Sequence, residues 1–467
     1  MPFVSCCDPT GNWVTKTVCM THSTQARFDE LGIAASLLAI LQEKGYTTPT
    51  PIQHQSIPIG LTGADLMGIA QTGTGKTLAF GIPMIQRLGT EKGRGLVVLP
   101  TRELALQVDE TFQKIGKKLG LRTVVLIGGE NIVKQNRLLN AKPHIIIATP
   151  GRLIDHLKQK TVNLSDIKIL VLDEADRMFD MGFAPQLKQI FAVLPKERQT
   201  MLFSATMPPE IVKIATLSMK MPVRVEVAPA GTSAEKVEQE VILVRKEDKQ
   251  RLLEKLLQEN KGTVLVFSRT KHGAKRISKK LLADGFSSGE IHSDRSLAQR
   301  IKALDGFKSG KIRVLIATDI AARGIDVKII ELVVNFDLPD QTEDYVHRIG
   351  RTGRAGTTGK AISFATPDQR GEIKNIERLI RKPVKMVPLP ELPPQKFEPR
   401  PVVEAGSQGH TPGNANNPFR RTSPPRGSHT GHVRNQQGQS QTSGQTQGQG
   451  QRPTSYFKQS RSRYKKY

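Results

Sequence analysis

Residues 70–77, AQTGTGKT, combine glycines, a lysine and a threonine in a spacing that suits phosphate binding. Gly73 and Gly75 would let the backbone curl so that its N–H groups face a chain of phosphates. Lys76 could neutralise the outer phosphates, and the Thr77 hydroxyl could ligate magnesium. The strict form of this loop begins with glycine where this chain has alanine, so the generic match is imperfect. Its place between an apolar run and a helix-compatible run nevertheless favours a phosphate-binding loop.

A second stretch, VLDEADRMF at 171–179, places three carboxylates directly after an apolar run. Asp173 stands at the expected C-terminal end of a strand, where parallel α/β sheets bind ligands, and could hold a metal through water. Glu174 could orient an attacking water molecule and accept its proton. A magnesium–nucleotide complex would offset negative charge that is costly to bury. The alternative is a solvated acidic loop, which a preceding buried strand argues against.

The elements that must position these residues are indicated by apolar runs that alternate with helical patterns. In the first half, the runs predict strands at Leu66–Ala70, Leu96–Leu99, Thr123–Ile127, Ile145–Ala148, Ile167–Leu172 and Thr200–Phe203. In the second half, they predict strands at Val241–Val244, Val264–Phe267, around Ile291, and at Val314–Ala317, Leu332–Phe336 and Ala361–Phe364. The helical patterns include Glu103–Leu119, Arg251–Leu257, Lys275–Leu282 and Ala298–Phe307. The alternation predicts two α/β domains, each a parallel sheet covered by helices, with a boundary near 228–234.

The bulk composition favours a polyanionic partner. The chain has 467 residues and a formal net charge of +26, which indicates nucleic acid rather than a membrane surface. No apolar run approaches the roughly 18 residues that a membrane-spanning helix needs. The N-terminus lacks a basic segment followed by an apolar one, so we expect a cytoplasmic protein and no secretion signal.

The N-terminal residues 1–19 contain all three cysteines, Cys6, Cys7 and Cys19. The rest of the chain therefore has no disulfide framework and no cysteine-based zinc site. Residues 1–19 could be a redox-sensitive extension, or they could lie upstream of a true start at Met20. The second interpretation is favoured because recognisable pattern begins only at Phe28.

The C-terminal segment after Lys382 has a different character. It is proline-rich up to residue 401, and beyond Glu404 it contains no acidic residue. Such a composition predicts disorder. The Gln/Gly-rich part is best interpreted as a solubilising linker. In the final stretch, SYFKQSRSRYKKY, aromatic residues alternate with cations, which suits contact with single-stranded RNA.

These residues, together with further short motifs in a fixed order, resemble the DEAD-box ATP-dependent RNA helicases. The family is named for the residues at 173–176, and the sequence is most similar to its bacterial RhlE-like group. The resemblance covers about Phe28 to Lys382 and implies tandem RecA-like domains. The motifs that carry it include TPTPIQ at 48–53, PTRELA at 100–105, TPGR at 149–152, SAT at 204–206, VFSRT at 266–270, ATDIAARGID at 317–326 and HRIGRTGR at 347–354. The expected parts are an extension (1–25), an ATP-binding domain (26–228), a helicase C-terminal domain (235–382) and a disordered basic tail (383–467).

The resemblance implies ATP and Mg²⁺ as ligands and assigns their contacts. It gives nucleotide binding to Phe28, Tyr46, Gln53, Ala70, Gln71, Thr72, Gly73, Thr74, Gly75, Lys76, Thr77 and Asp326. It gives catalysis to Lys76, Asp173, Glu174, Arg351 and Arg354, the last two as arginine fingers, and metal binding to Thr77 and Asp173. Gln53 would read the adenine edge, because an amide donates and accepts at once. Either aromatic residue of the nucleotide set could pack near the base.

The resemblance also implies coupling and RNA contacts. It assigns coupling between hydrolysis and strand separation to Asp176, Ser204, Thr206 and His347. It assigns RNA contacts to Pro100, Thr101, Arg102, Gly129, Thr149, Gly151, Arg152, Arg269, Arg300 and Thr318. Such residues suit a sugar-phosphate backbone, so little sequence preference is expected. In isolation, each of these motifs would more often be a capping turn or a solvated basic face.

One stretch departs from the family pattern. In HSDRSLAQR at 292–300, Ser293 replaces a glycine and Leu297 replaces a glutamine. We expect a modest loss of coupling rather than inactivity. The implied function is an ATP-driven clamp that locally separates short RNA duplexes or remodels RNA–protein complexes, in ribosome assembly or RNA turnover. Ribosomal precursors or RNA-decay machinery are the implied partners. A non-enzymatic RNA scaffold, a DNA helicase and an unrelated P-loop ATPase are the rival hypotheses.

Overall fold

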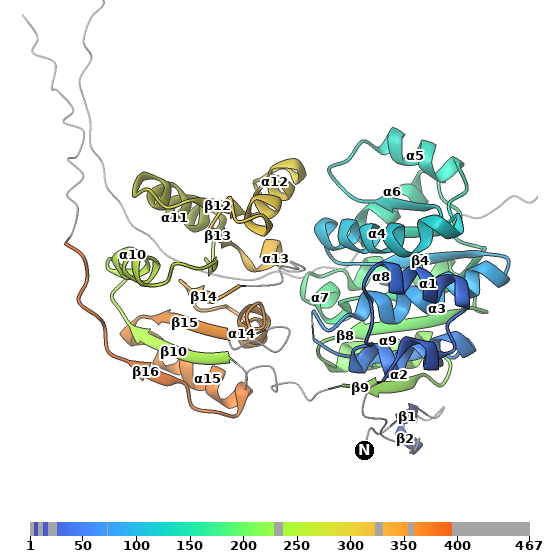
Figure 1. Cartoon of the computed structure of the whole chain (residues 1–467), viewed down its shortest axis with the longest axis horizontal. Helices are drawn as coiled ribbons and strands as arrows, with labels where there is room; N and C mark the ends of the chain where they lie inside the picture. Colours follow the sequence, from blue (N-terminus) through green and yellow to red (C-terminus); the bar gives the residue numbers. More distant parts are fainter. Residues whose placement is uncertain are drawn as a thin grey trace, which may run out of the picture. The chain divides into compact units, whose positions relative to one another are not determined.

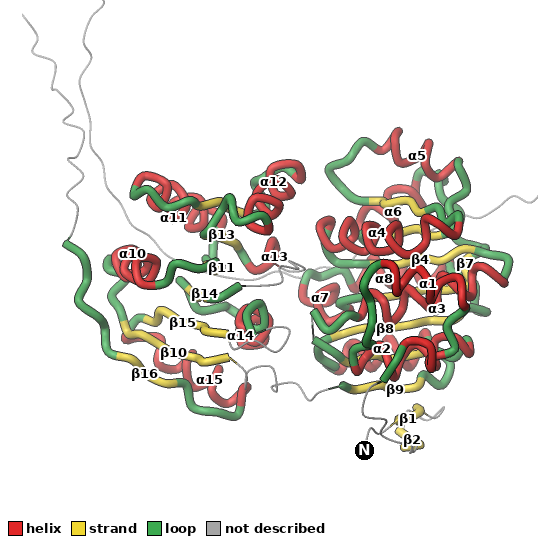
Figure 2. Tube along the Cα trace, in the orientation of Figure 1, coloured by secondary structure: helices red, strands yellow, loops and turns green. Residues whose placement is uncertain are grey.

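The computed structural model describes residues 4–7, 13–16, 26–71, 73–227, 237–322, 330–353 and 359–394, with the backbone alone at 4–7 and 13–16. We call residues 26–227 the first lobe and residues 237–394 the second lobe. Each lobe is a sheet with helices packed on both of its faces (Figures 1 and 2).

The sheet of the first lobe contains seven parallel strands in the order β9-β3-β8-β7-β4-β6-β5. The strands are β3 (Leu66–Ile69), β4 (Arg94–Val98), β5 (Thr123–Leu126), β6 (Ile145–Ala148), β7 (Ile167–Leu172), β8 (Gln199–Ser204) and β9 (Val223–Glu226). A hairpin of β1 (Val4–Cys7) and β2 (Trp13–Lys16) joins β9 in antiparallel orientation. Strands β3, β6 and β8 are wholly buried, as expected for a sheet covered on both faces.

Nine helices belong to the first lobe among the residues described. They are α1 (Ala35–Glu43), α2 (Pro51–Thr62), α3 (Lys76–Thr90), α4 (Arg102–Gly116), α5 (Ile132–Asn140), α6 (Pro150–Lys158), α7 (Ala175–Asp180), α8 (Ala184–Val193) and α9 (Pro209–Ser218). Alternate strand residues point to opposite faces of the sheet and so feed two apolar clusters. One cluster joins the sheet to α1–α4, and the other joins it to α5–α9.

The second lobe contains a seven-stranded sheet, parallel throughout, in the order β12-β13-β11-β14-β15-β10-β16. The strands are β10 (Val237–Leu243), β11 (Val264–Phe267), β12 (Ser288–Ile291), β13 (Val314–Ala317), β14 (Leu332–Asn335), β15 (Gly359–Ala365) and β16 (Lys385–Val387). The helices are α10 (Lys249–Glu259), α11 (Lys271–Ala283), α12 (Leu297–Lys308), α13 (Asp319–Ala322), α14 (Thr342–Ile349) and α15 (Arg370–Ile380). Two apolar clusters again lie on the two faces.

The tandem RecA-like fold predicted from the sequence is confirmed. The sequence patterns missed four short strands, β1, β2, β9 and β16. Strand β16 pairs with β10 and lies inside the segment that was expected to be disordered from residue 383 onward, so order continues beyond Lys382. Its three residues are too few to show a period. The basic end of the tail lies outside the described residues. No helix in the described ranges is long and apolar enough to cross a membrane.

Candidate active site and nucleic-acid interface

The phosphate loop joins the C-terminal end of β3 to α3. Gly73 and Gly75 adopt φ values of 88° and 89°, a conformation that side chains disfavour. The Nζ of Lys76 is buried and donates to the backbone carbonyl of Ala70 at 2.9 Å. The loop is therefore curled around the lysine, as a cradle for phosphate oxygens requires. Thr77 follows Lys76 in the first turn of α3.

Gln53 links the start of α2 to this loop. Its Oε1 accepts from the Thr50 N–H at 3.0 Å, which completes a capping box, and its Nε2 donates to the Gly75 carbonyl at 3.0 Å. A Cβ at Gly75 would lie 2.3 Å from Gln53 Nε2, so close approach requires glycine there. The structure places the aromatic candidates differently: Phe28 is buried in the core, whereas Tyr46 keeps part of its surface exposed.

Three carboxylates follow β7 and are almost completely buried. Burial raises the pKa of Asp173 to about 6, although the charge of Lys76 opposes it. Burial alone would raise the pKa of Glu174, but three cationic neighbours outweigh it and hold that pKa below its ordinary value. The neighbours are Arg177, Lys76 and Arg351. Burial would likewise raise the pKa of Asp176, yet surrounding cations lower it, with His347 and Lys76 foremost. The positive charge of Lys76 thus acts to lower the pKa of all three acids.

Glu174 has a left-handed backbone, with φ 51° and ψ 50°. Four other non-glycine residues in the described ranges share a positive φ, and all four are exposed; Glu174 alone is buried. Strain of this kind persists where the surroundings enforce it, as functional sites do. Here it turns the chain sharply from β7 into α7.

Arg177 is the companion of Glu174 on the first turn of α7. Its Nε lies 3.4 Å from Glu174 Oε2, and its side chain is 2% exposed. Neither its Nη1 nor its Nη2 has a hydrogen-bond partner among the described residues. A buried guanidinium with unused donors is unusual, because such donors normally find acceptors.

Asp176 connects the acids to the end of β8. Its Oδ2 accepts from the N–H groups of Ala205 and Thr206 at 3.0 and 2.9 Å, and from Thr206 Oγ1 at 3.0 Å. Its own N–H donates to Ser204 Oγ at 3.1 Å. The SAT stretch and the acidic turn are therefore held together by four hydrogen bonds.

The arginines of the second lobe have different environments. Arg348 binds both carboxylate oxygens of Asp319 at 2.6 and 2.7 Å and donates to Asn335 Oδ1 and the Asp337 carbonyl. Its guanidinium also lies 5.0 Å from the centre of the Phe267 ring. Arg348 and Arg351 both line a small cavity with Arg177, and the positive charge of Arg351 lowers the pKa of Glu174. The hydrogen bonds of Arg348 to Asp319, Asn335 and Asp337 indicate a structural role for Arg348.

The candidate RNA track runs along the strand ends of the first lobe. Thr101 caps α4 by accepting from the Leu104 N–H at 3.3 Å. The Arg102 guanidinium lies over the two glycines that follow β5: a Cβ at Gly129 would stand 2.4 Å from its Nη1. Gly151 faces open space, which leaves the start of α6 accessible.

Arg152 is held by its own chain. Its Nη1 donates to the Glu130 carbonyl at 3.0 Å and to Gln135 Oε1 at 2.9 Å. Gln135 is buried, donates to the Ile127 carbonyl at 2.9 Å, and contacts His156 Nε2 at 3.0 Å. The buried amide of Gln135 therefore holds Arg152 of the candidate track in place. The sequence patterns did not predict this role of Gln135.

Known proteins resemble this chain over both lobes. A family model described as DEAD/DEAH box helicase matches residues 50–214, and one described as helicase conserved C-terminal domain matches residues 248–356. The chain is 43% identical over 368 residues to the DEAD-box ATP-dependent RNA helicase CshA of Bacillus cereus, covering 78% of this chain and 70% of that protein. It is 42% identical over 382 residues to the ATP-dependent rRNA helicase RRP3 of Yarrowia lipolytica, covering 81% and 80%. Dbp5 of S. cerevisiae, solved bound to RNA and ADP BeF3, aligns with a TM-score of 0.69 and 30% identity over 78% of this chain and 96% of that chain.

This chain belongs to the DEAD-box ATP-dependent RNA helicase family. As a member, the helicase binds ATP and RNA, and RNA stimulates its hydrolysis of ATP.

Several predicted site residues of the helicase have a defined place. Arg300 Nη2 pairs with Glu103 Oε1 at 2.9 Å, and Arg269 pairs with Asp340 at 3.1 Å. Leu297, the departure from the family pattern, is buried in an apolar cluster with first-lobe residues. Three predicted residues lie outside the described ranges: Thr72, Asp326 and Arg354.

Two functional candidates of the helicase, Arg177 and Gln135, were missed from the sequence, as was the structural role of Arg348. All three depend on burial, which no spacing reveals. For Arg177, its position three residues after Glu174 on a short helix was the only available signal.

Proposed function

We propose that ATP is hydrolysed at the carboxyl edge of the first-lobe sheet. The observation that supports this proposal is that Lys76 of the phosphate loop acts on three buried acids. Its positive charge acts to lower the pKa of Asp173, Glu174 and Asp176. The proposed catalytic residues are Lys76, Asp173, Glu174, Arg351 and Arg354. The donor set fits a nucleotide with its metal, because it pairs a curled loop and a cation with carboxylates.

In the proposed mechanism, each residue has one task. Lys76 leaves the Ala70 carbonyl and neutralises the outer phosphates. Glu174, ionised through its cationic neighbours, orients the attacking water and accepts its proton. Arg351 and Arg354 stabilise the charge on the transferred phosphoryl group. Gln53 binds the adenine edge, and its hydrogen bond to the Gly75 carbonyl connects adenine binding to the phosphate loop.

We propose that Thr77 and Asp173 hold Mg²⁺. When bound, Mg²⁺ would supply positive charge beside the phosphates. The raised pKa of Asp173, caused by its burial, supports this assignment because a nearby cation is what would keep that carboxyl ionised.

The RNA is proposed to lie along the strand ends of both lobes. The contacts would come from Pro100, Thr101, Arg102, Gly129, Thr149, Gly151, Arg152, Arg269, Arg300 and Thr318. Backbone amides and cations of this kind grip sugar and phosphate without reading bases. Asp176, Ser204, Thr206 and His347 would couple hydrolysis to RNA remodelling. Because ATP and RNA would each favour the same joined arrangement, their binding should be cooperative.

For the biological setting, we propose a cytoplasmic helicase of the bacterial RhlE-like group that acts on ribosomal precursors or with RNA-decay machinery. The relative named as an rRNA helicase and the basic C-terminal segment support this setting. The proposed units are residues 26–228 and 235–382. We propose that the basic end of the tail adds RNA affinity. Sequencing of RNA crosslinked to the helicase in cells would test the setting, and an absence of ribosomal and decay intermediates would overturn it.

The decisive experiment measures phosphate release from ATP by the full chain, with single-stranded RNA, with matched DNA and with neither. We expect RNA alone to stimulate strongly. Glu174→Gln should lower the stimulated rate by at least about a hundredfold, because it removes the base. The same variant should still bind ATP, which shows that the site is folded.

Two outcomes would contradict the proposal. Wild-type turnover by Glu174→Gln would remove Glu174 from catalysis. Equal stimulation by DNA would remove the RNA-specific backbone assignment. Chelation of divalent ions should stop hydrolysis and added Mg²⁺ should restore it; persistence of hydrolysis after chelation would overturn the metal assignment.

A further inference from the structure

The second lobe has an open sheet edge at β12, far in sequence from the proposed ATP-site residues of the first lobe. β12 is the last strand in the sheet order and pairs only with β13 among the described strands. The carbonyls of Ser287 and Ile291 accept from N–H groups on and after β13. Strand alternation therefore directs the backbone N–H and C=O of Ser288 and Glu290 away from the sheet.

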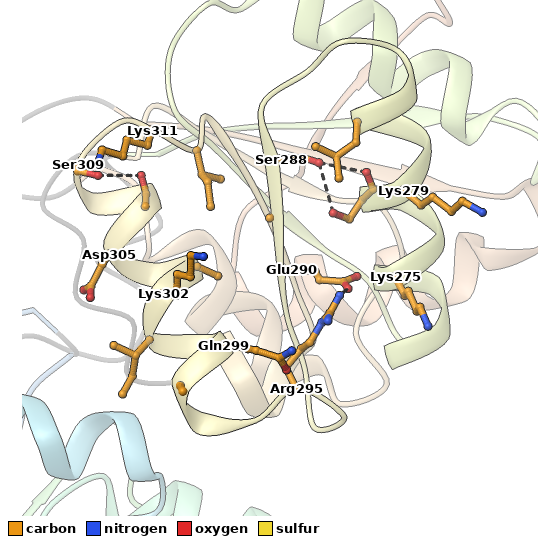
Figure 3. A pocket seen from close by; sticks show the side chains of 18 residues that line it. Lys275, Lys279, Ser288, Glu290, Arg295, Gln299, Lys302, Asp305, Ser309 and Lys311 are labelled. Carbon is orange, nitrogen blue, oxygen red and sulfur yellow. Dashed lines mark hydrogen bonds and ion pairs between the residues drawn. The ribbon is translucent and has the colours of Figure 1, made fainter.

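A groove of about 1190 Å³ lies along this edge between α11 and α12. Figure 3 shows α11 and α12 on its two sides, with Ser288 and Glu290 of β12 between them. Its lining includes the apolar groups of Leu282, Ala303 and Ile312, and Leu282 is 56% exposed. A Cβ at Gly289 would lie 2.9 Å from Ile312 and 3.8 Å from Ala303 of α12, so glycine lets β12 lie close to both residues.

The rim of the groove is cationic. Lys275 and Lys279 extend from α11, Lys302 extends from α12, and Lys311 stands before β13; all four are exposed. None of them forms an ion pair with another residue of the described ranges. Two acids also line the groove: Glu290 pairs with Arg295, and Asp305 is exposed on α12, so the four lysines remain in excess.

Two occupants are disfavoured by the same features. RNA phosphates would match the lysines, but an RNA strand has no main-chain amides to pair with the open edge of β12, and the lining offers no aromatic ring on which its bases could stack. The C-terminal segment of the chain itself has no acidic residue beyond Glu404, and the last described residues, up to 394, follow β16 at the opposite edge of the sheet. A basic segment cannot neutralise a lysine rim.

We propose that this groove binds an extended acidic segment of another protein. The segment would pair its main chain with β12, rest aliphatic side chains on the floor and place carboxylates opposite the four lysines. A four-residue edge bordered by lysines disfavours pairing with most other chains, because the positive charges of the lysines are left unpaired. An acidic segment is selected because its carboxylates offset these charges.

The first test selects a displayed library of random short peptides against the full chain. We expect the enriched peptides to be rich in Asp and Glu that alternate with Val, Ile or Leu. An enriched peptide labelled with a fluorophore then gives affinities by anisotropy. Enrichment without an acidic bias, or no enrichment, would overturn the proposal.

A pair of charge reversals then locates the site. Lys279→Glu with Lys302→Glu should weaken the peptide at least about tenfold, which is the scale expected for charges that face each other directly. The matched control is Lys261→Glu with Lys374→Glu, two exposed lysines of the same lobe outside the groove, and it should bind as the wild type does. Both double variants should retain RNA-stimulated ATP hydrolysis. Equal weakening by both pairs would reduce the effect to net charge and overturn the site.

The strand pairing has its own readout. N-methylation of alternate backbone amides in the peptide removes donors without changing side chains, and it should abolish binding in one register only. If neither register matters, the segment does not add to β12. If single-stranded RNA displaces the peptide and loses affinity for the groove variant, the surface is a nucleic-acid contact instead.

Discussion

Two buried arginines, Arg177 in the first lobe and Arg348 in the second, differ in how their donors are used. Both are at most 2% exposed. Arg348 has hydrogen bonds from Nε, Nη1 and Nη2, and an aromatic ring lies beneath it. Arg177 has one carboxylate at 3.4 Å, and its Nη1 and Nη2 have no partner among the described residues.

The difference separates architecture from function. When all donors of a buried ion are hydrogen-bonded within the native fold, these bonds offset its desolvation cost, so removing the ion lowers the stability of the protein. When a buried ion has unused donors, an added acceptor is needed to form the missing hydrogen bonds. This difference divides the two arginines by role: Arg348 stabilises the second lobe, whereas Arg177 lies beside Glu174, the carboxylate that we propose for catalysis.

The largest effect should come from Arg348→Ala. Removing the guanidinium leaves Asp319, Asn335 Oδ1 and the Asp337 carbonyl without their donor. Breaking a buried pair costs about 3–5 kcal/mol, and the partial exposure of Asp319 reduces this to about 2–4 kcal/mol. Denaturant unfolding should show the loss, and Arg348→Lys should recover only part of it because an ammonium cannot form the bidentate pair.

The control is Arg370→Ala, an exposed position at the start of α15, which should change stability by less than about 0.5 kcal/mol. Should Arg348→Ala unfold at the wild-type denaturant concentration while ATP turnover collapses, the arginine would be a site residue and the division above would fail.

The next effect should come from Arg177→Met, which keeps length but removes charge. Glu174 then loses the cation 3.4 Å from its Oε2, and its carboxylate is held less firmly. We expect kcat to fall about tenfold, equivalent to about 1.4 kcal/mol of barrier, with KM for ATP within about twofold. Steady-state kinetics with saturating RNA would measure both constants.

Rescue distinguishes positioning from packing for Arg177. Arg177→Lys should restore part of kcat, because a cation returns beside Glu174, whereas packing would be served as well by methionine. A variant that loses stability as much as Arg348→Ala, with kcat unchanged, would place Arg177 among the structural residues.

The sequence predicted the fold and the proposed nucleotide site through local patterns. Strand Ile145–Ala148 coincides with the prediction because a fully buried parallel strand forms a continuous apolar run, and Ile167–Leu172 coincides although exposed Lys168 interrupts its run. The phosphate loop and the acids were found because their chemistry is contiguous in sequence. The hydrogen bonds of Arg348 and of Gln135 were not predicted, because the partners of Arg348 lie 11 to 29 residues away in the sequence and those of Gln135 lie 8 to 21 residues away. Strand β16 was missed for a different reason, since its pairing partner β10 defines it.

A smaller effect should come from Thr206→Val. Thr206 tests the division between structural and functional residues, because its hydroxyl is hydrogen-bonded within the fold and yet lies in the proposed site. The change removes one of three hydrogen bonds to Asp176 Oδ2 and should cost about 1 kcal/mol of stability. If Thr206 couples hydrolysis to remodelling, fewer short duplexes should separate per ATP hydrolysed, with the hydrolysis rate itself within about twofold. Duplex separation and phosphate release in one reaction give the ratio. An unchanged ratio would leave Thr206 as a purely structural contact, and Thr216→Val on α9 is the exposed control.

The smallest effect concerns His156, the fully buried imidazole behind the candidate RNA track. Burial lowers the pKa of His156, Arg152 acts in the same direction, and Asp155 opposes them. The unfolded chain therefore takes up a proton near the ordinary value of 6.5 while the native chain stays neutral. Stability is unaffected above that pH and falls below it, by at most about 1.4 kcal/mol per pH unit, until the native pKa is reached. Thermal unfolding between about pH 7.5 and about pH 5.5 should show a smaller decline in His156→Gln than in the wild type, because the variant has no proton to bind. A parallel decline in both proteins would assign the acid sensitivity to groups other than His156.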